Sequence, residues 1–376
     1  MFGDKQSIGF LFYGVSELWI EASNLVKSES DLVVKIARNH SRLDKYSHGR
    51  QVPRDIRAGK ATVDDISNLF EYLPFKKPLP PYSPTEDEAN YLKGEWYLVQ
   101  SLISGVQQAA DDKFSDIKEI LLFIEAHCKI ERDFLLQFKK QPKEENVAKY
   151  LSEWLRLDEK LLLEKGLKSD IAILVRSSLY WCSMLEKIAA TWIYESESKL
   201  LSSIMPTFDP YKEQFYPSSE KLLERFKSMY EQEHHNGKRK PWTYFYRHIA
   251  IKKQQDKQLG EQYYTDDVDP DIESIKKQFL RWKKGDLFSF SAFRKNVLIS
   301  HYSFKGSDRE LEAFLIYFIS NYLTLVQKKL LVRIDKRADT PSLIELMIDE
   351  YAKVDEVKAL VEQRFQHFLK VGSLEP

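Results

Sequence analysis

Basic side chains alternate with aromatic rings in residues 238–247, KRKPWTYFYR. Lys and Arg bind phosphate groups and aromatic rings stack on unpaired bases, so this pattern is typical of proteins that bind nucleic-acid strands. Trp, Tyr and Arg also anchor protein–protein interfaces. The stretch therefore predicts a binding surface, and either nucleic acid or protein fits it. Its candidate phosphate contacts are Lys238, Arg239, Lys240 and Arg247.

A second basic stretch covers residues 271–294, DIESIKKQFLRWKKGDLFSFSAFR. The spacing predicts an amphipathic helix, a tight turn at Gly285 and a second short helix. Glycine permits the positive φ that ends a helix within one residue, and Trp282 is expected to wedge the two helices together. The candidate phosphate contacts are Lys277, Arg281, Lys283, Lys284 and Arg294.

The order of a basic residue, Trp282 and then Gly285 is similar to that in the repressor-type helix-turn-helix. The resemblance covers about two dozen residues, and it implies DNA binding, with a second helix that packs on the core. A helix that reads bases would need Arg or short polar side chains pointing outward. The same order of residue types occurs at Tyr46, Gly49 and Val52.

A third basic region covers residues 35–60, where eight basic residues face two acidic ones. The resulting local charge is +6, which would attract phosphate groups. A basic face can also simply be solvated on the outside of a helix. The candidate contacts in this region are Arg42, Lys45, Arg50 and Arg54.

Residues that would indicate an enzyme are sparse. The sequence contains no P-loop, glycine-rich dinucleotide fingerprint, nucleophile elbow or zinc-ligand spacing, so we expect no cofactor and no metal. One catalytic alternative stays open. Arg42 with His48, and Arg294 with His301, resemble the Arg-then-His spacing of the all-helical HEPN-type ribonucleases, in which a histidine beside an arginine would act as a general base.

The totals limit the class of protein. The 376 residues contain 57 basic and 57 acidic side chains, which excludes a globally basic nucleic-acid binder but permits local basic faces. No apolar run approaches the roughly 18 residues that a membrane helix needs, so we predict no membrane partner and a cytoplasmic location. Cys128 and Cys182 lie in apolar helical runs, which predicts buried, reduced thiols.

Apolar residues recur at three- and four-residue steps along most of the chain, which predicts an all-α, multi-helix protein. We predict an N-terminal helical unit with a basic face (1–73), a proline-rich linker (74–84), a central helical bundle (85–205) and a C-terminal helical domain (206–376). The C-terminal domain would contain the helix-turn-helix-like hairpin and the basic, aromatic patch.

Several helix ends in the C-terminal part carry local signals. Ser218 or Ser219 is expected to cap a helix that ends near His235, and Ser307 to cap another. Thr340 is expected to be the N-cap of a further helix, with Pro341 at its first helical position. The last helix is expected to follow a break near Val354 and to end at Gly372.

These patterns together favour a non-enzymatic accessory or regulatory protein that binds the nucleic-acid backbone, DNA in preference to RNA, through local basic faces. A helical scaffold or adaptor subunit of a larger complex, for example in a bacterial defence or mobile-element system, is the main alternative. A HEPN-like ribonuclease is the second. We also expect a protein partner or a homo-oligomer.

Overall fold

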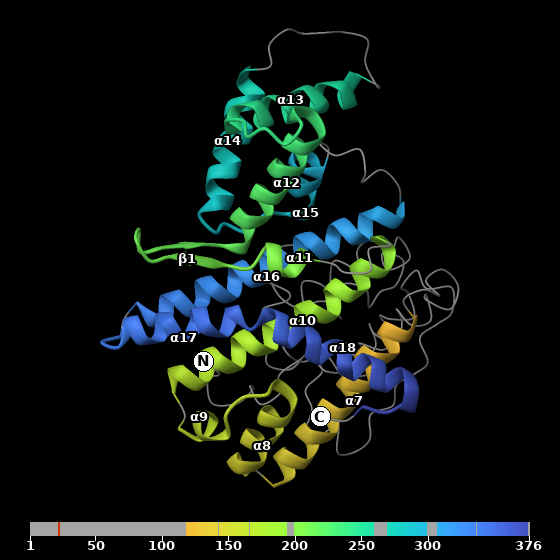
Figure 1. Ribbon diagram of the computed structural model, residues 1–376, viewed down its shortest axis with the longest axis vertical. Helices are drawn as coiled ribbons and strands as arrows, with labels where there is room; N and C mark the ends of the chain where they lie inside the picture. The colour runs from red at the N-terminus through yellow and green to blue at the C-terminus, as the bar shows by residue number, and fades with distance from the viewer. Residues whose placement is uncertain are drawn as a thin grey trace, which may run out of the picture. The chain divides into compact units, whose positions relative to one another are not determined.

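A computed structural model describes Ala22 and residues 118–141, 143–164, 166–193, 199–258, 269–298, 307–335 and 337–374. Figure 1 gives the labels of the helices and strands. The helices are α7 (Lys118–Lys140), α8 (Glu144–Leu155), α9 (Glu159–Leu163), α10 (Leu167–Ile193), α11 (Leu200–Ser203), α12 (Ser218–His235), α13 (Trp242–Gln258), α14 (Asp269–Lys283), α15 (Phe290–Asn296), α16 (Ser307–Ile334), α17 (Thr340–Ala352) and α18 (Val354–Val371). The described strands are β1 (Thr207–Asp209) and β2 (Gln214–Tyr216). The fold is therefore all-α, as predicted.

The chain divides into two compact units. Residues 118–184 and 355–374 belong to unit 1, whereas Ala22 and the described residues between 185 and 354 belong to unit 2. The predicted division into four segments stays a prediction, because Ala22 is the one described residue before position 118.

In unit 1, the buried side chains of α7 lie at steps of three and four residues, which places them on one face of the helix. They are Ile120, Leu121, Phe123, Ile124, His127, Cys128 and Glu131. Phe123 packs edge-on against Phe365 of α18, with the ring centroids 5.2 Å apart. Residues more than 200 positions apart in sequence thus share one hydrophobic core.

His127 is completely enclosed in this core. Its Nδ1 donates to the carbonyl oxygen of Phe123 at 2.8 Å, because a carbonyl can only accept. Its Nε2 therefore accepts from the hydroxyl of Tyr180 at 2.7 Å. Burial is the largest cause that lowers the pKa of His127 to about 3; the Phe123 carbonyl opposes the shift and the charge of Arg364 adds to it. His127 is consequently neutral at physiological pH.

The C-terminal end of α8 is capped by arginines from two other helices. α8 has no basic residue in its own last turn. Arg364 of α18 donates to the carbonyls of Trp154 at 2.7 Å and Glu153 at 2.9 Å. Arg176 of α10 donates to the carbonyl of Leu155 at 3.3 Å. The last four carbonyls of a helix have no partner within it, so these buried guanidinium groups satisfy three of them and offset the helix dipole.

In unit 2, α12, α13 and α14 pack against one another, and α12 and α15 also pack on α16 (Figure 1). The hairpin of β1 and β2 precedes α12 and pairs Phe208 with Phe215. The sequence did not lead us to expect strands here. Each strand has three residues, which is too short for an alternating pattern to stand out among the prolines.

The extents of the helices predicted in unit 2 and for α18 are confirmed, whereas the predicted caps of α12 and α17 are wrong. The N-cap of α12 is Pro217 rather than Ser218 or Ser219, the N-cap of α17 is Asp339 rather than Thr340, and neither makes a side-chain cap hydrogen bond. α12 ends at His235, α16 begins at Ser307 and α17 begins at Thr340. The break near Val354 separates α17 from α18, and the positive φ of 75° at Gly372 ends α18. Local signals therefore defined these ends, because each depends on one or two residues rather than on tertiary contacts.

Two further predictions, on the cysteines and on membrane helices, can be compared with the structure. Cys128 and Cys182 are both buried and form no disulfide. Among the described helices, none is at once long enough and apolar enough to cross a membrane.

Candidate nucleic-acid interface

Aromatic rings join α13 to α14. Phe279 of α14 is completely buried, and its ring centroid lies 6.2 Å from that of Trp242 and 6.1 Å from that of Phe245. Tyr246 is closer, at 5.3 Å, and burial raises its pKa to about 12. All three rings meet Phe279 edge-on, the geometry that aromatic pairs prefer. Two rings that alternate with basic residues in the sequence, Trp242 and Tyr246, thus hold the helices together.

The glycine turn after α14 has the geometry expected from the sequence. The amide of Asp286 donates to the carbonyl of Arg281 at 3.1 Å, and the amide of Gly285 donates to that of Trp282 at 3.0 Å. These two bonds form a Schellman motif. Gly285 has a φ of 86°, and a β-carbon there would lie 3.7 Å from Thr324. Space is sufficient, so the left-handed backbone is what requires glycine.

Polar side chains from α12 and α16 fix the position of this turn. The hydroxyl of Ser219 donates to the carbonyl of Trp282 at 2.7 Å, and the amide of Ser219 donates to the hydroxyl of Thr324 at 2.9 Å. Asn321 holds Phe288 from both sides: its Nδ2 donates to the carbonyl at 2.8 Å and its Oδ1 accepts from the amide at 3.3 Å. The end of α14 is therefore rigidly placed within unit 2.

The short helix after the turn, α15, has seven residues. Phe293 is buried, and Phe290 at the first position packs against Tyr317 of α16 at 5.3 Å between centroids. Arg294 and Lys295 are exposed near its C-terminal end. Helix-turn-helix proteins contact bases with the N-terminal residues of the second helix, a position that packs inward here. The helix-turn-helix resemblance stays a prediction, and the exposed residues of α15 suit phosphates better than base edges.

Lys283 is engaged within the fold. Its ammonium lies 3.4 Å from the centroid of the Trp242 ring, and that of Lys227 lies 5.5 Å from the same centroid. Burial is the largest cause that lowers the pKa of Lys283, while the carboxylates of Glu220 and Glu224 oppose the shift. Half-buried cation–π contacts of this kind stabilise a fold, so Lys283 is poorly placed to contact phosphate.

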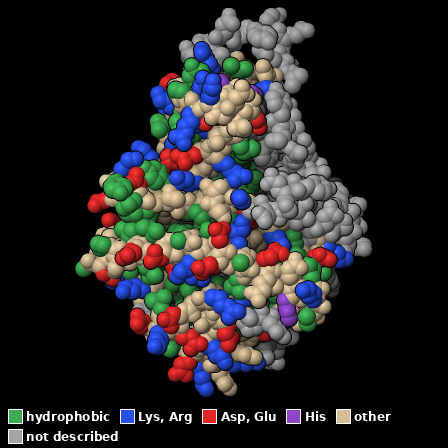
Figure 2. All heavy atoms as spheres, viewed as in Figure 1, with side chains coloured by type: hydrophobic (Ala, Val, Ile, Leu, Met, Phe, Trp, Pro, Cys, Tyr) green, Lys and Arg blue, Asp and Glu red, His purple; other side chains and the backbone are tan. Residues whose placement is uncertain are grey.

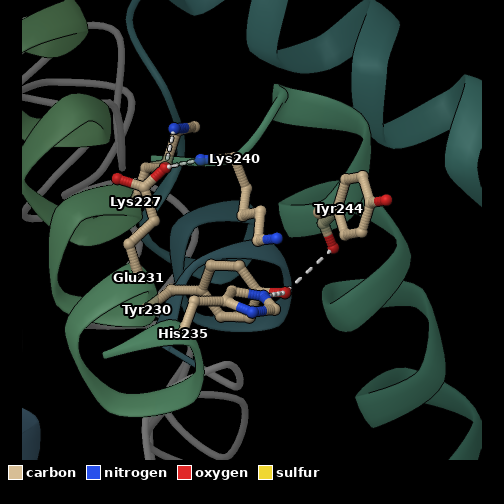
Figure 3. A network of polar contacts seen from close by, with 6 residues as sticks. All are labelled: Lys227, Tyr230, Glu231, His235, Lys240 and Tyr244. Atoms are coloured by element: carbon tan, nitrogen blue, oxygen red, sulfur yellow. Dashed lines mark hydrogen bonds and ion pairs between the residues drawn. The ribbon is translucent and has the colours of Figure 1, made fainter. Parts of the chain in front are cut away.

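A buried carboxylate organises the turn between α12 and α13 (Figure 3). Glu231 accepts from the ammonium of Lys227 and, at 2.6 Å, from the backbone amide of Lys240. Burial alone would raise the pKa of Glu231, but these two hydrogen bonds outweigh it and lower the pKa. The ammonium of Lys240 lies 5.5 Å from the centroid of the Tyr244 ring. The start of α13 is thus tied to α12.

Three histidines lie near this turn. The hydroxyl of Tyr230 is 2.9 Å from Nε2 of His235 and donates to the carbonyl of Tyr244 at 3.5 Å. The rings of His234 and His248 are 4.6 Å apart between centroids. Within the described ranges, no three His, Cys, Asp or Glu side chains are arranged to hold a metal ion. The rings therefore act as packing and hydrogen-bonding groups in this structure.

Most of the predicted phosphate contacts in the described part of unit 2 are exposed to solvent. Seven predicted phosphate contacts are exposed, and we call them the basic surface: Lys238, Arg239, Arg247, Lys277, Arg281, Lys284 and Arg294. Arg281 pairs with Asp286 through its Nε at 2.9 Å, yet its side chain remains 77% exposed. Lys240 and Lys283 are half-buried. The predicted contacts Arg42, Lys45, Arg50 and Arg54 lie outside the described residues.

Packing brings two acid-free stretches of sequence together. Residues 236–255 contain six Lys or Arg and no acidic residue, and residues 274–285 contain five Lys or Arg and no acidic residue. α13 and α14, which carry most of these residues, pack side by side. Figure 2 shows Lys and Arg side chains among apolar ones over this region. The fold thus concentrates positive charge that is separated in the sequence.

Unit 1 contains an open cleft of about 530 Å³ between α7 and α8. Phe134 and Tyr150 stack face to face in its wall, 3.9 Å apart between centroids. Lys149 in the cleft pairs with Glu153 at 3.8 Å. This pairing offsets positive charge within the cleft, so the basic surface of unit 2 is the stronger candidate for an anionic partner.

The catalytic alternative cannot be built from the described residues, because His48 and His301 both lie outside them. Comparisons of the chain with protein-family models, with curated proteins and with solved structures find no match. The interpretation of the basic surface therefore depends on its own geometry and charge.

Proposed function

We propose that this protein is a non-enzymatic accessory or regulatory protein that binds the phosphate backbone of nucleic acid through the basic surface of unit 2. The observation that supports this most is the packing of the two acid-free helical stretches, 236–255 and 274–285. Backbone binding needs cations whose head groups reach solvent from a rigid support. The anchored turn of α14 and the tied start of α13 supply that support.

The exposed cations of α14 and of the turn that follows it have a spacing that suits phosphates. Lys277, Arg281 and Lys284 follow one another at steps of four and three residues. With a rise of about 1.5 Å per residue, the three span about 10 Å along the helix. One DNA strand carries a phosphate about every 3.4 Å of helix axis. The row is therefore long enough to face about three phosphates of one strand.

Salt-dependent binding of the full chain to duplex DNA and to RNA tests the proposal. We expect the logarithm of the binding constant to fall linearly with the logarithm of salt concentration. The double variant Lys277→Glu, Lys284→Glu should bind at least about tenfold more weakly at about 0.1 M salt, with the slope reduced by about 2.

The matched control is Lys160→Glu, Lys168→Glu, which reverses two exposed lysines of α9 and α10 in unit 1. This control changes the net charge by the same amount but lies away from the basic surface in sequence. If both variants lose equal affinity, binding is a net-charge effect and the basic surface is not the site. Absence of any binding at low salt would reject the proposed function.

A protein scaffold or adaptor role is the second candidate, and the β1–β2 hairpin favours it. Tyr211 at the hairpin tip is 97% exposed, and exposed Tyr side chains frequently anchor interfaces. Sedimentation of the wild type and of Tyr211→Ala over a range of concentrations tests self-association through this tip. A mass that rises with concentration in the wild type alone would support it, whereas identical masses would exclude it.

A further inference from the structure

We infer that the basic surface binds double-stranded nucleic acid by its phosphates, rather than a single strand by its bases. This inference rests on the proposed function and specifies its partner. It comes from where the aromatic rings of α13 and α14 lie, because rings decide which form of nucleic acid such a surface holds.

Proteins that bind single strands combine a basic groove with aromatic rings that lie open for stacking. The sequence of residues 238–247 has both residue types, but the fold separates them. The half-buried Trp242 and the buried Tyr246 pack edge-on against the buried Phe279, at 6.2 Å and 5.3 Å between centroids. An unpaired base cannot stack on rings that already pack against the next helix.

The ring of Trp242 is half-buried and is also covered by charge. The ammonium of Lys283 lies 3.4 Å from its centroid and that of Lys227 lies 5.5 Å away. The ring of Tyr246 lies 5.9 Å from the Trp242 ring in a stacked arrangement. A base would have to displace at least one of these partners before it could reach the indole face.

In the described residues between 199 and 298, the exposed aromatic side chains are Tyr244 and Tyr211. Tyr244 is 50% exposed, and the ammonium of Lys240 lies 5.5 Å from its ring centroid. Tyr211 belongs to the β1–β2 hairpin rather than to α13 or α14. One partly covered ring among seven exposed cations is a poor platform for successive bases.

Charge density then favours the duplex. A duplex carries about one phosphate charge per 1.7 Å of axis, twice that of either strand alone. For about six phosphate contacts, the slope of log K against log salt is about −5 for a duplex and about −4 for a single strand. A surface that offers cations without stacking rings gains more from the partner that releases more counterions.

Fluorescence anisotropy with three labelled probes tests the inference on the full chain: a duplex of about 20 base pairs, one of its strands, and an abasic strand of equal length, all at about 0.1 M salt. We expect the duplex to bind at least about fivefold more tightly than the single strand, and the abasic strand to match the single strand within about twofold. Tyr244→Ala should change single-strand binding by less than about twofold.

The opposing outcomes are distinct. A duplex preference below about fivefold, an abasic strand that binds more than about twofold more weakly than the natural one, or a larger loss in Tyr244→Ala would each overturn the inference and leave backbone binding intact. Ile251→Ala, which truncates another exposed apolar side chain of α13, serves as the control. Failure of all three probes to bind at low salt would instead reject the proposed function.

Discussion

Each unit of this protein contains a cation that lies against a tryptophan ring, but the two cations are held differently. The guanidinium carbon of Arg364 in unit 1 lies 4.6 Å from the Trp154 centroid, and the residue is 5% exposed. The ammonium of Lys283 in unit 2 lies 3.4 Å from the Trp242 centroid on a half-buried residue. Arg364 also caps helix carbonyls, whereas Lys283 lies near surface carboxylates.

The difference follows from the chemistry of the two head groups. A guanidinium is weakly hydrated and presents planar donors, so it can be buried if backbone carbonyls accept its hydrogen bonds. An ammonium is strongly hydrated and keeps part of its contact with water. Arg364 therefore stabilises unit 1 from inside, whereas in unit 2 Lys283 packs against a ring at the surface and its neighbour Lys284 is exposed to solvent.

The largest effect is expected from Arg364→Met. Methionine fills much of the same volume but leaves the carbonyls of Trp154 and Glu153 without their donor. Leaving a buried acceptor without its donor typically costs about 1–3 kcal/mol, so the loss of both contacts should lower the free energy of unfolding in urea by about 2–5 kcal/mol.

Gln363→Met, at the exposed neighbouring position of α18, is the matched control and should change the unfolding free energy by less than about 0.5 kcal/mol. A loss of about 1 kcal/mol or less in Arg364→Met would mean that water can replace the guanidinium at the end of α8. The contrast between a buried and a half-buried cation would then disappear.

A smaller effect is expected from pH, through His127. The unfolded chain takes up a proton on this residue near pH 6.5, whereas burial lowers its pKa to about 3 in the folded chain. The free energy of unfolding therefore falls as the pH is lowered from about 6.5 toward about 3, because the unfolded chain binds a proton that the folded chain does not. Between pH 7 and pH 5, wild type should lose about 2 kcal/mol more than His127→Asn, which cannot take up a proton.

Urea unfolding of both proteins at pH 7, 6 and 5 measures this difference in slope. The slopes should coincide above pH 7, where the unfolded chain binds little proton on His127. Parallel curves down to pH 5 would show that the imidazole is protonated equally easily in the folded chain, and hence that the core around Tyr180 and Arg364 admits water.

The sequence predicted the helices of unit 2 better than it predicted what their side chains contact. The amphipathic pattern of α14 was recognised, and its buried residues Ile275, Phe279 and Trp282 recur at steps of four and three residues. At about 100° per residue, Lys284 lies about 170° from the centre of that face and Lys283 only about 70° from it. Helical phase therefore distinguishes the exposed lysine from the half-buried one, although both were predicted to contact phosphate.

Other contacts had no local signal. Arg364 reads in the sequence as a charged residue of an amphipathic helix, and its acceptors on α8 are about 210 positions away. From the sequence, Trp242 and Tyr246 were interpreted as rings that could stack on bases. Their burial could not be predicted from residues 238–247, because it depends on Phe279 of a different helix. The contacts of these side chains therefore depend on residues that are distant in sequence. The basic region at 35–60 lies outside the described residues, so its predicted role stays a prediction.

The smallest effects are expected from the neighbours Lys283 and Lys284, and they bear most directly on the comparison. Lys283→Gln removes the ammonium above Trp242 and should lower the free energy of unfolding by about 0.5–1 kcal/mol, with less than about a twofold change in DNA affinity. Lys284→Gln should leave stability within about 0.5 kcal/mol of wild type but weaken DNA binding by about threefold or more and reduce the salt slope by about 1.

Both variants lose one positive charge from adjacent positions at the C-terminal end of α14, so net charge cannot account for a difference between them. Urea unfolding and anisotropy titration on the same two proteins give both readouts. If Lys283→Gln weakens DNA binding as much as Lys284→Gln does, the ammonium above Trp242 leaves the ring to meet phosphate. Lys283 would then be part of the binding surface. Half-burial of a lysine would in that case not distinguish a cation that stabilises the fold from a cation that binds a ligand.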